Sequence, residues 1–299
     1  MRPLFRLLRS PIWALALALA WPAACQARSL KEILQTHELR ACIVPYHPSS
    51  ATATPPNCRE QCHFSGPVYE EALAFAHHLG KNIQLKTLRL EWDEQFYNQD
   101  GKVEREASYT PRLLANGSCD ILPNRLTKNA WRLKKMDFVT LFTNRMMVVA
   151  NIKLKNRLQS ADQLAGLHAA VLDNSSYSTW LLEQNQTRYA AHPVRIELMS
   201  VEDSLRAVDS GKLDFTLLDS DIAIWTTRHQ LKHAYVAFPV GAKDEVGWAM
   251  RKQDKDLQAA VAAFFAEQKR NEDSALNRIW TPHYGLSLNR LITLVNSTQ

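Results

Sequence analysis

The feature that most constrains the fold is a pattern of helix, glycine turn and strand that occurs twice. Residues 112–122 contain this pattern around a G-x-x-D turn that begins at Gly117, and residues 205–217 contain it again with the turn at Gly211. An amphipathic helix precedes each glycine and a run of strand-forming residues follows it. The repetition indicates two lobes built on related α/β units.

The composition is that of an ordinary globular protein. The 299 residues are 46% hydrophobic and 22% charged, which is enough core for one large domain or two lobes of middling size. The net charge of +6 drops to about +3 when the three arginines near the N-terminus are set aside, too mild and dispersed for nucleic-acid binding. Beyond the leader, no apolar run approaches the ~20 residues that span a bilayer.

The first 27 residues read as a secretory signal peptide. Three arginines precede an apolar segment at 12–20, and small residues at 23–27 provide a cleavage site. We therefore expect a periplasmic protein whose mature chain begins near residue 28. Cys25 after two alanines also suggests a lipid-attachment site, but Pro22 stands where such sites usually have leucine, so we do not expect a lipid anchor.

Export agrees with the cysteine count. Outside the leader there are four cysteines, Cys42, Cys58, Cys62 and Cys119, an even number as is usual in an oxidising compartment. Three disulfide pairings are possible, and two of these cysteines lie in one loop where they could close a small ring. A metal site built on Cys58, Cys62 and His63 lacks a second pair of ligands, so we expect neither a metal nor another cofactor.

A short basic stretch at residues 126–138 follows a strand-like run and reads as a cap and a short helix. Thr127 or Asn129 can accept hydrogen bonds from the free amides of the first turn. Arg132 then lies where a helix begins at the carboxyl end of a strand, the place where open α/β sheets bind ligands. Its guanidinium can hold a carboxylate through two parallel hydrogen bonds. The alternative is that Arg132 is one more solvated cation among the neighbouring lysines.

Two later segments offer candidate groups of the same kind. Ser175 and Ser176 open a helix, where free amides and hydroxyls form a seat for an anion, with plain N-capping as the alternative for either serine. Asp219 follows the strand at 215–218 and places an acceptor-only carboxylate at its carboxyl end. Its alternative role is to cap the next helix.

In order and spacing these segments resemble the family 3 periplasmic solute-binding proteins of the amino-acid-binding type. Residues 126–138 are similar to that family's L-T-I-T-P-E-R followed by D-F-S, although Asn129 replaces the second threonine. The L-L-D-S at 217–220 resembles its V-V-x-D-S, and residues 247–252 resemble G-I-A-V-R-K. The resemblance covers the chain from about residue 30 to 286.

The resemblance implies an α/β, two-lobed, periplasmic-binding-protein-like fold (type II, Venus-flytrap) with two crossover hinge strands. The first lobe is expected to comprise residues 28–143 and 247–299, and the second lobe residues 144–246.

In this fold the strands of Cys42 and Cys119 should be parallel neighbours, so we prefer the pairing Cys42–Cys119 with Cys58–Cys62. Residues 94–108 interrupt the family pattern, which usually runs directly into the next helix. We interpret them as an inserted surface loop on the first lobe, with contact to a partner as the alternative.

The resemblance also implies roles for individual residues. Arg132 would hold the α-carboxylate of a ligand and Asp219 its α-ammonium group. Tyr46 is the nearest match to an aromatic residue that often stacks on the ligand, with packing on its own loop as the alternative, and Asn174 replaces a glycine. The candidate ligand-binding residues are Arg132, Asp219, Ser175, Ser176, Tyr46, Thr127 and Asn129.

We therefore expect a protein that clamps an amino acid or related carboxylate-bearing solute, for ABC import or for presentation to a membrane sensor. The alternatives are a regulatory module that works without a small ligand and, since some relatives are cyclohexadienyl dehydratases, an enzyme of that kind. No nucleophile triad, metal cluster or phosphate loop stands out, and a lytic transglycosylase carrying this module would need a further domain. We expect no enzymatic activity and no nucleic-acid partner.

Overall fold

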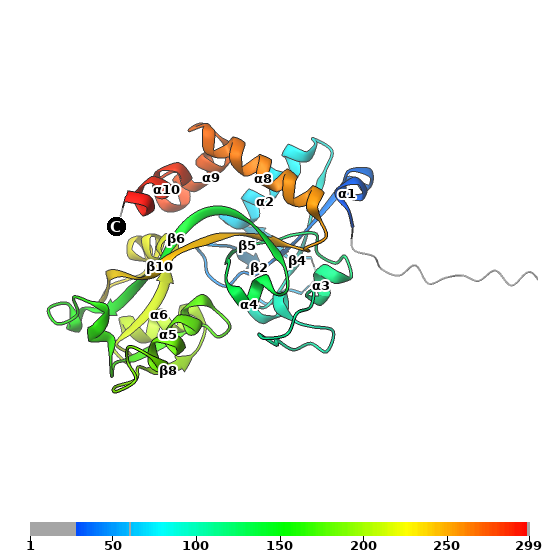
Figure 1. Cartoon of the computed structure of the whole chain (residues 1–299). Helices are drawn as coiled ribbons and strands as arrows, with labels where there is room; N and C mark the ends of the chain where they lie inside the picture. The colour runs from blue at the N-terminus through cyan, green and yellow to red at the C-terminus, as the bar shows by residue number, and fades with distance from the viewer. Residues whose placement is uncertain (1–27, 60, 298–299) are drawn as a thin grey trace, which may run out of the picture.

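The computed structural model describes residues 28–59 and 61–297, so the predicted signal peptide and Cys25 lie outside the described residues. Two α/β parts are joined by a pair of long neighbouring strands, β6 (Asp137–Asn151) and β10 (Ala234–Met250), which run antiparallel (Figure 1). The β6–β10 ladder shifts register at three places. Such irregularities let a ribbon bend, which suits strands that pass between two lobes. The predicted two-lobed fold with two crossover strands is confirmed.

The strands form one large and two small sheets. The large sheet has the order β5-β10-β6-β9-β7-β8, and β1 pairs in parallel with β4. A small hairpin, β2 with β3, lies in a stretch that looks irregular in sequence. The remaining strands are β1 (Glu38–Ile43), β2 (Thr52–Thr54), β3 (His63–Ser65), β4 (Gln84–Arg89), β5 (Leu122–Thr127), β7 (His168–Val171), β8 (Arg195–Leu198) and β9 (Phe215–Asp219).

Helices cover both parts. The helices of the first lobe are α1 (Leu30–Thr36), α2 (Pro67–Leu79), η1 (Trp92–Phe96), α3 (Arg112–Ala115), α4 (Ala130–Leu133), α8 (Lys255–Arg270), α9 (Ala275–Tyr284) and α10 (Leu288–Ser297). The other part carries η2 (Ile152–Leu154), η3 (Ala161–Leu164), α5 (Ser176–Gln186), α6 (Val201–Asp209) and α7 (Ser220–His229). Helices α8, α9 and α10 lie together beyond the crossover strands (Figure 1). Among the described helices, none is long and apolar enough to cross a membrane.

The repeated turn in the sequence is repeated in the structure. Gly117 and Gly211 have φ angles of 74° and 76°, a region that glycine enters without strain. Three residues after each glycine, the carboxylates of Asp120 and Asp214 accept hydrogen bonds of 2.8 Å from a backbone amide of the neighbouring strand. The G-x-x-D motif therefore ties each helix–strand turn to the adjacent strand, β1 in one lobe and β7 in the other.

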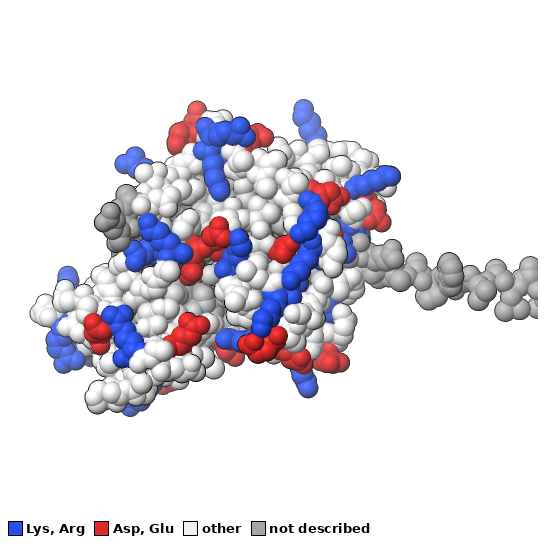
Figure 2. Space-filling view, viewed as in Figure 1, with Lys and Arg blue, Asp and Glu red and all other residues white. Residues whose placement is uncertain are grey.

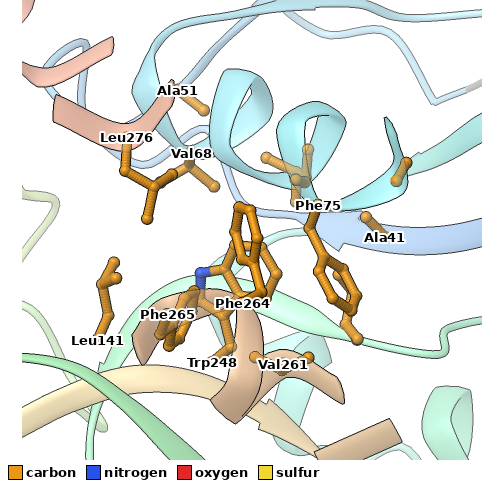
Figure 3. Close-up of a cluster of buried hydrophobic side chains, with 14 of the residues drawn as sticks. Ala41, Ala51, Val68, Phe75, Leu141, Trp248, Val261, Phe264, Phe265 and Leu276 are labelled. Atoms are coloured by element: carbon orange, nitrogen blue, oxygen red, sulfur yellow. The ribbon is translucent and has the colours of Figure 1, made fainter. Parts of the chain in front are cut away.

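Each lobe has its own apolar core. In the first lobe, Trp248 of β10 packs against Phe75 of α2 and Phe265 of α8, with ring centroids 5.7 and 5.0 Å apart (Figure 3). In the second, Phe215 and Leu217 of β9 are buried with residues of β6, β7 and α5. Separate cores let the two lobes move as rigid bodies about the strands that join them.

Both predicted disulfides are present. Cys42 of β1 is joined to Cys119 and Cys58 is joined to Cys62. The first bond connects β1 to the segment before β5, and Ala41 pairs in parallel with Ile121 beside it. The preferred pairing is confirmed.

Candidate functional site

The end of β5 places Arg132 in the interior. Helix α4 begins three residues after Thr127, and the Oδ1 atom of its N-cap residue Asn129 accepts a hydrogen bond of 3.2 Å from the Arg132 amide. Only 1% of the Arg132 surface is exposed. Arg132 is therefore not a solvated surface cation, and Asn129 serves as the helix cap.

The Arg132 guanidinium crosses from the first lobe to the second. Its Nη1 atom donates to the Thr127 carbonyl at 2.9 Å, and its Nη2 atom donates to the Asn174 carbonyl at 3.1 Å. Its Nε atom has no hydrogen-bond partner among the described residues. The guanidinium carbon lies 5.0–5.9 Å from the ring centroids of three aromatic residues, Trp92, Phe96 and Trp131.

Burial disfavours the charge of this arginine. It lowers the pKa of Arg132 to about 10, and the carboxylate of Asp219 opposes that shift, while the charge of Arg105 adds to it. Arg132 remains protonated at neutral pH, but with less solvation than a surface arginine. A carboxylate bound beside it would compensate a charge that is costly to bury.

The serines at the start of α5 have different partners. Ser175 is the N-cap: its Oγ atom accepts from the Ser178 amide at 3.1 Å and donates to the Leu172 carbonyl at 2.5 Å. Ser176 instead faces the first lobe, where its Oγ atom accepts a hydrogen bond of 3.3 Å from the Thr127 hydroxyl. The cap role thus falls to Ser175, while Ser176 has its hydroxyl between the lobes.

Asp219 ends β9 and lies at the N-cap position of α7, yet its side chain makes no capping hydrogen bond among the described residues. Burial raises the pKa of the Asp219 carboxyl well above its usual value, and the charges of Asp221 and Asp244 add to this. A hydrogen bond from Tyr177 and the charge of Arg132 oppose the shift. The Asp219 carboxyl is therefore buried near Arg132 in surroundings that disfavour its ionised form, and it does not cap α7.

These residues enclose a small cavity between the lobes. Its volume is about 10 Å³, roughly the space for one water molecule. Six of the seven candidate residues line it, and Asn129 does not. The lining residues are Tyr46, Trp92, Arg125, Leu126, Thr127, Arg132, Leu172, Ser175, Ser176, Tyr177 and Asp219.

A larger cavity of about 470 Å³ adjoins the small one, and Tyr46, Trp92 and Leu172 line both. The rings of Tyr46 and Trp92 meet edge to face with centroids 5.1 Å apart. Polar and charged side chains, among them Arg89 and Glu202, line the larger cavity. The two cavities together form the space between the lobes at the carboxyl ends of the strands.

The most important site residue that the sequence analysis missed is Arg125. It is 5% exposed, and its guanidinium donates to Glu71, Asp221 and the Tyr284 hydroxyl. Its only signal in the sequence is a charged residue in the middle of a buried strand, two residues before Thr127. Charged residues are rarely fully buried without a partner, so this position could have been marked.

Other features bear on the kinds of ligand. Across residues 28–59 and 61–297, no group of three His, Cys, Asp or Glu side chains could hold a metal ion. On the face drawn in Figure 2, lysines and arginines are interspersed with aspartates and glutamates.

The fold defines a class of two-lobed α/β proteins, and solved structures of amino-acid-binding proteins share it. The structure superposes with a TM-score of 0.67 on an amino-acid ABC transporter substrate-binding protein from Streptococcus pneumoniae bound to L-arginine. That match is 16% identical and covers 87% of this chain and 99% of the other. At this identity the likeness establishes the fold, and the resemblance to amino-acid-binding proteins is confirmed at that level.

Sequence similarity points to two kinds of relative, and no family model matches the chain. The L-cystine-binding protein TcyJ of Escherichia coli K12 is 27% identical over 218 residues, 71% of this chain and 72% of that protein. The membrane-bound lytic murein transglycosylase F of Desulfosudis oleivorans is 25% identical over 221 residues, 72% of this chain. The match spans 43% of the transglycosylase, so the chain covers less than half of its length.

The expectation of no enzymatic activity is contradicted by the names of several relatives of the chain. Several of its relatives, from different bacteria, are named lytic murein transglycosylase F, an enzyme. The part of the enzyme that each match covers ranges from 40% to 52% of its length. The expectation rested on the lack of a catalytic motif in this chain, and that criterion does not apply to a module that an enzyme shares with binding proteins.

Proposed function

We propose that this protein binds an amino acid or a related carboxylate-bearing solute between its two lobes. One observation carries the proposal: Arg132 of the first lobe and Asp219 of the second line the same buried cavity from opposite sides. A zwitterion presents a carboxylate to the one and an ammonium group to the other. Pairing in a water-poor cleft is stronger than in solvent, so lobe closure would favour such a ligand.

Each candidate residue has a defined task in the proposed complex. Arg132 exchanges its two carbonyl partners for a carboxylate, since a guanidinium binds that group in a bidentate way. Asp219 accepts hydrogen bonds from the ammonium group, and the Thr127 and Ser176 hydroxyls contact the carboxylate. Tyr46 and Trp92 flank the passage to the larger cavity, which would take the ligand's side chain. The small volume of the inner cavity requires the lobes to separate before a ligand enters.

The proposed setting is the periplasm. Two disulfides and a leader with signal-peptide features favour an oxidising compartment outside the cytoplasm. We take residues 28–143 with 247–299 as one lobe and residues 144–246 as the other. Delivery to an ABC permease is favoured by the likeness to a transporter's substrate-binding protein, and presentation to a membrane sensor is the other partner we consider.

A second candidate function is a regulatory module that closes without a small ligand. It is favoured by the Arg132 guanidinium, which already has protein carbonyls as partners, and by the transglycosylase relatives, in which a similar module belongs to a cell-wall enzyme. A ligand screen separates the two functions.

The screen is a thermal-shift assay on the mature chain with the twenty amino acids, common dicarboxylates and L-cystine. A ligand at 100 times its Kd stabilises the protein by about 2.7 kcal/mol, which raises the melting temperature by several degrees. We expect at least one compound that carries both a carboxylate and an ammonium group to do so. If none does, the regulatory module becomes the better description.

Proton release should accompany binding. The raised pKa of the Asp219 carboxyl favours its protonated form in the free protein, whereas a bound ammonium group favours the ionised form. Affinity should therefore rise as the pH increases through that pKa. Titration calorimetry at several pH values, in buffers of different ionisation enthalpy, measures the protons transferred. Proton uptake on binding would contradict the assigned role of Asp219.

A further inference from the structure

Two departures from the family pattern contact each other across the cleft. One is the inserted segment at residues 94–108, which belongs to the first lobe, and the other is Asn174, which replaces a glycine at the start of α5. Arg105 of the insertion donates from Nε to the Asn174 Oδ1 atom at 3.1 Å. Neither the insertion nor the asparagine, taken alone in the sequence, predicts this contact.

The side-chain amide of Asn174 is held at both ends by the first lobe. Its Nδ2 atom donates to Asp93 Oδ1 at 3.0 Å, and its Oδ1 atom accepts from Arg105. Its backbone carbonyl is the acceptor for Arg132 Nη2. Asn174 has a φ angle of 52°, a conformation that asparagine tolerates better than most residues. Three residues of the first lobe thus bind this single residue of the second.

Arg105 makes a second contact with the second lobe. Its Nη1 atom donates to the Thr179 Oγ1 atom of α5 at 3.2 Å. Its guanidinium carbon also lies 5.4 Å from the ring centroid of Trp131, next to the site arginine. One side chain of the insertion therefore connects α4, α5 and the turn that precedes α5.

The backbone at Arg105 and two residues after it is fixed to the first lobe by a buried lysine. Lys135, 1% exposed, donates from Nζ to the carbonyls of Arg105 at 3.1 Å and Ala107 at 2.9 Å. Its ammonium also lies 4.5 Å from the ring centroid of Tyr109. The backbone of the segment is thus bound to the first lobe, and the Arg105 side chain extends across the cleft to the second lobe.

We infer that Arg105 and Asn174 form a latch that holds the two lobes closed in the absence of a ligand. Arg105 acts as a positioning residue: it fixes Asn174, whose carbonyl in turn occupies the Arg132 guanidinium. A ligand must then open the latch and displace that carbonyl before it can bind. The link to ligand entry rests on the proposed function, whereas closure of the free protein does not.

Small-angle X-ray scattering of the ligand-free mature chain tests the latch, with each of its two residues replaced in turn. Arg105→Ala removes the two hydrogen bonds that this side chain makes to the second lobe, to Asn174 and Thr179. Asn174→Gly removes the amide while keeping a residue that adopts positive φ easily. Lys102→Ala is the matched control, an exposed cation of the same segment. We expect a compact wild type and control, and a larger radius of gyration in both latch variants.

Additivity provides the second readout. Because Arg105 and Asn174 share one contact, the double variant should open by less than the sum of the two single variants, each of which also loses a bond of its own, Arg105–Thr179 or Asn174–Asp93. Melting temperatures close to that of the wild type would show that the folds are intact, so that opening reflects the latch alone. An unchanged radius of gyration in both variants overturns the inference, as does a wild type already as open as they are. None of these measurements uses a ligand, so their outcome is independent of the ligand screen.

Discussion

Replacement of Glu71 by alanine is expected to lower the free energy of unfolding by about 3–5 kcal/mol, the usual effect of removing one partner of a buried ion pair. Glu71 lies on α2 with none of its surface exposed, and its carboxylate accepts from Arg125 and from the Trp280 indole at 2.6 Å. Without it, the buried Arg125 guanidinium keeps Asp221 as its carboxylate partner. Urea denaturation at neutral pH measures the loss.

The adjacent residue offers a matched control. Glu70 differs from Glu71 in that its side chain is 39% exposed, and it pairs with His283 at 3.1 Å. Surface pairs of this kind contribute about 0–1 kcal/mol, so Glu70→Ala should change the unfolding free energy by no more than that. Equal losses for the two variants would show that burial of the Arg125 network does not set the effect.

The same network explains an unusual backbone conformation beside the site. Arg125 lies in β5 with a φ angle of 51°, a conformation that costs a residue with a long side chain on the order of 1–3 kcal/mol. The carboxylates of Glu71 and Asp221 hold its guanidinium, and Trp280 stacks on it with 4.4 Å between the guanidinium carbon and a ring centroid. Burial alone would lower the pKa of Arg125, but these carboxylates raise it well above its usual value.

The fold could be predicted from the sequence because its signals are local. A glycine turn, an aspartate three residues later and a strand are encoded within a dozen residues, and both copies fold alike. The Cys42–Cys119 disulfide could be predicted only with the help of the resemblance, which implied that the strands of these two cysteines lie side by side. Helix α10 lies beyond the residues that the resemblance covers, and the analysis did not predict it.

Candidate site residues could be predicted where their location at the end of a strand or the start of a helix determines where they lie in the fold. Arg132, Ser176 and Asp219 follow strands or open helices, and all three line one cavity. The Arg105–Asn174 contact was not predictable, because it joins residues 69 positions apart through side chains alone. Arg125 was missed for a similar reason: its carboxylate partners come from α2 and α7, distant in the sequence.

Replacement of Arg132 by alanine is expected to have the largest effect on binding. Removing one partner of a buried, hydrogen-bonded charge pair costs about 2–5 kcal/mol, which raises Kd roughly 30- to 4,000-fold. Arg132→Lys should lose much of the affinity as well, because an ammonium group lacks the planar fork that binds a carboxylate. Arg188→Ala, which removes an exposed cation paired with Asp162, is the control and should bind as the wild type does.

The stability of the ligand-free variant distinguishes a binding residue from a structural one. Burial lowers the pKa of Arg132 to about 10, so its charge opposes folding, and alanine removes that charge. The lost hydrogen bonds to the Thr127 and Asn174 carbonyls act in the other direction. We therefore expect a melting temperature close to that of the wild type together with a lost thermal shift. A ligand from the screen that still stabilises Arg132→Ala fully would mean that the carboxylate binds elsewhere.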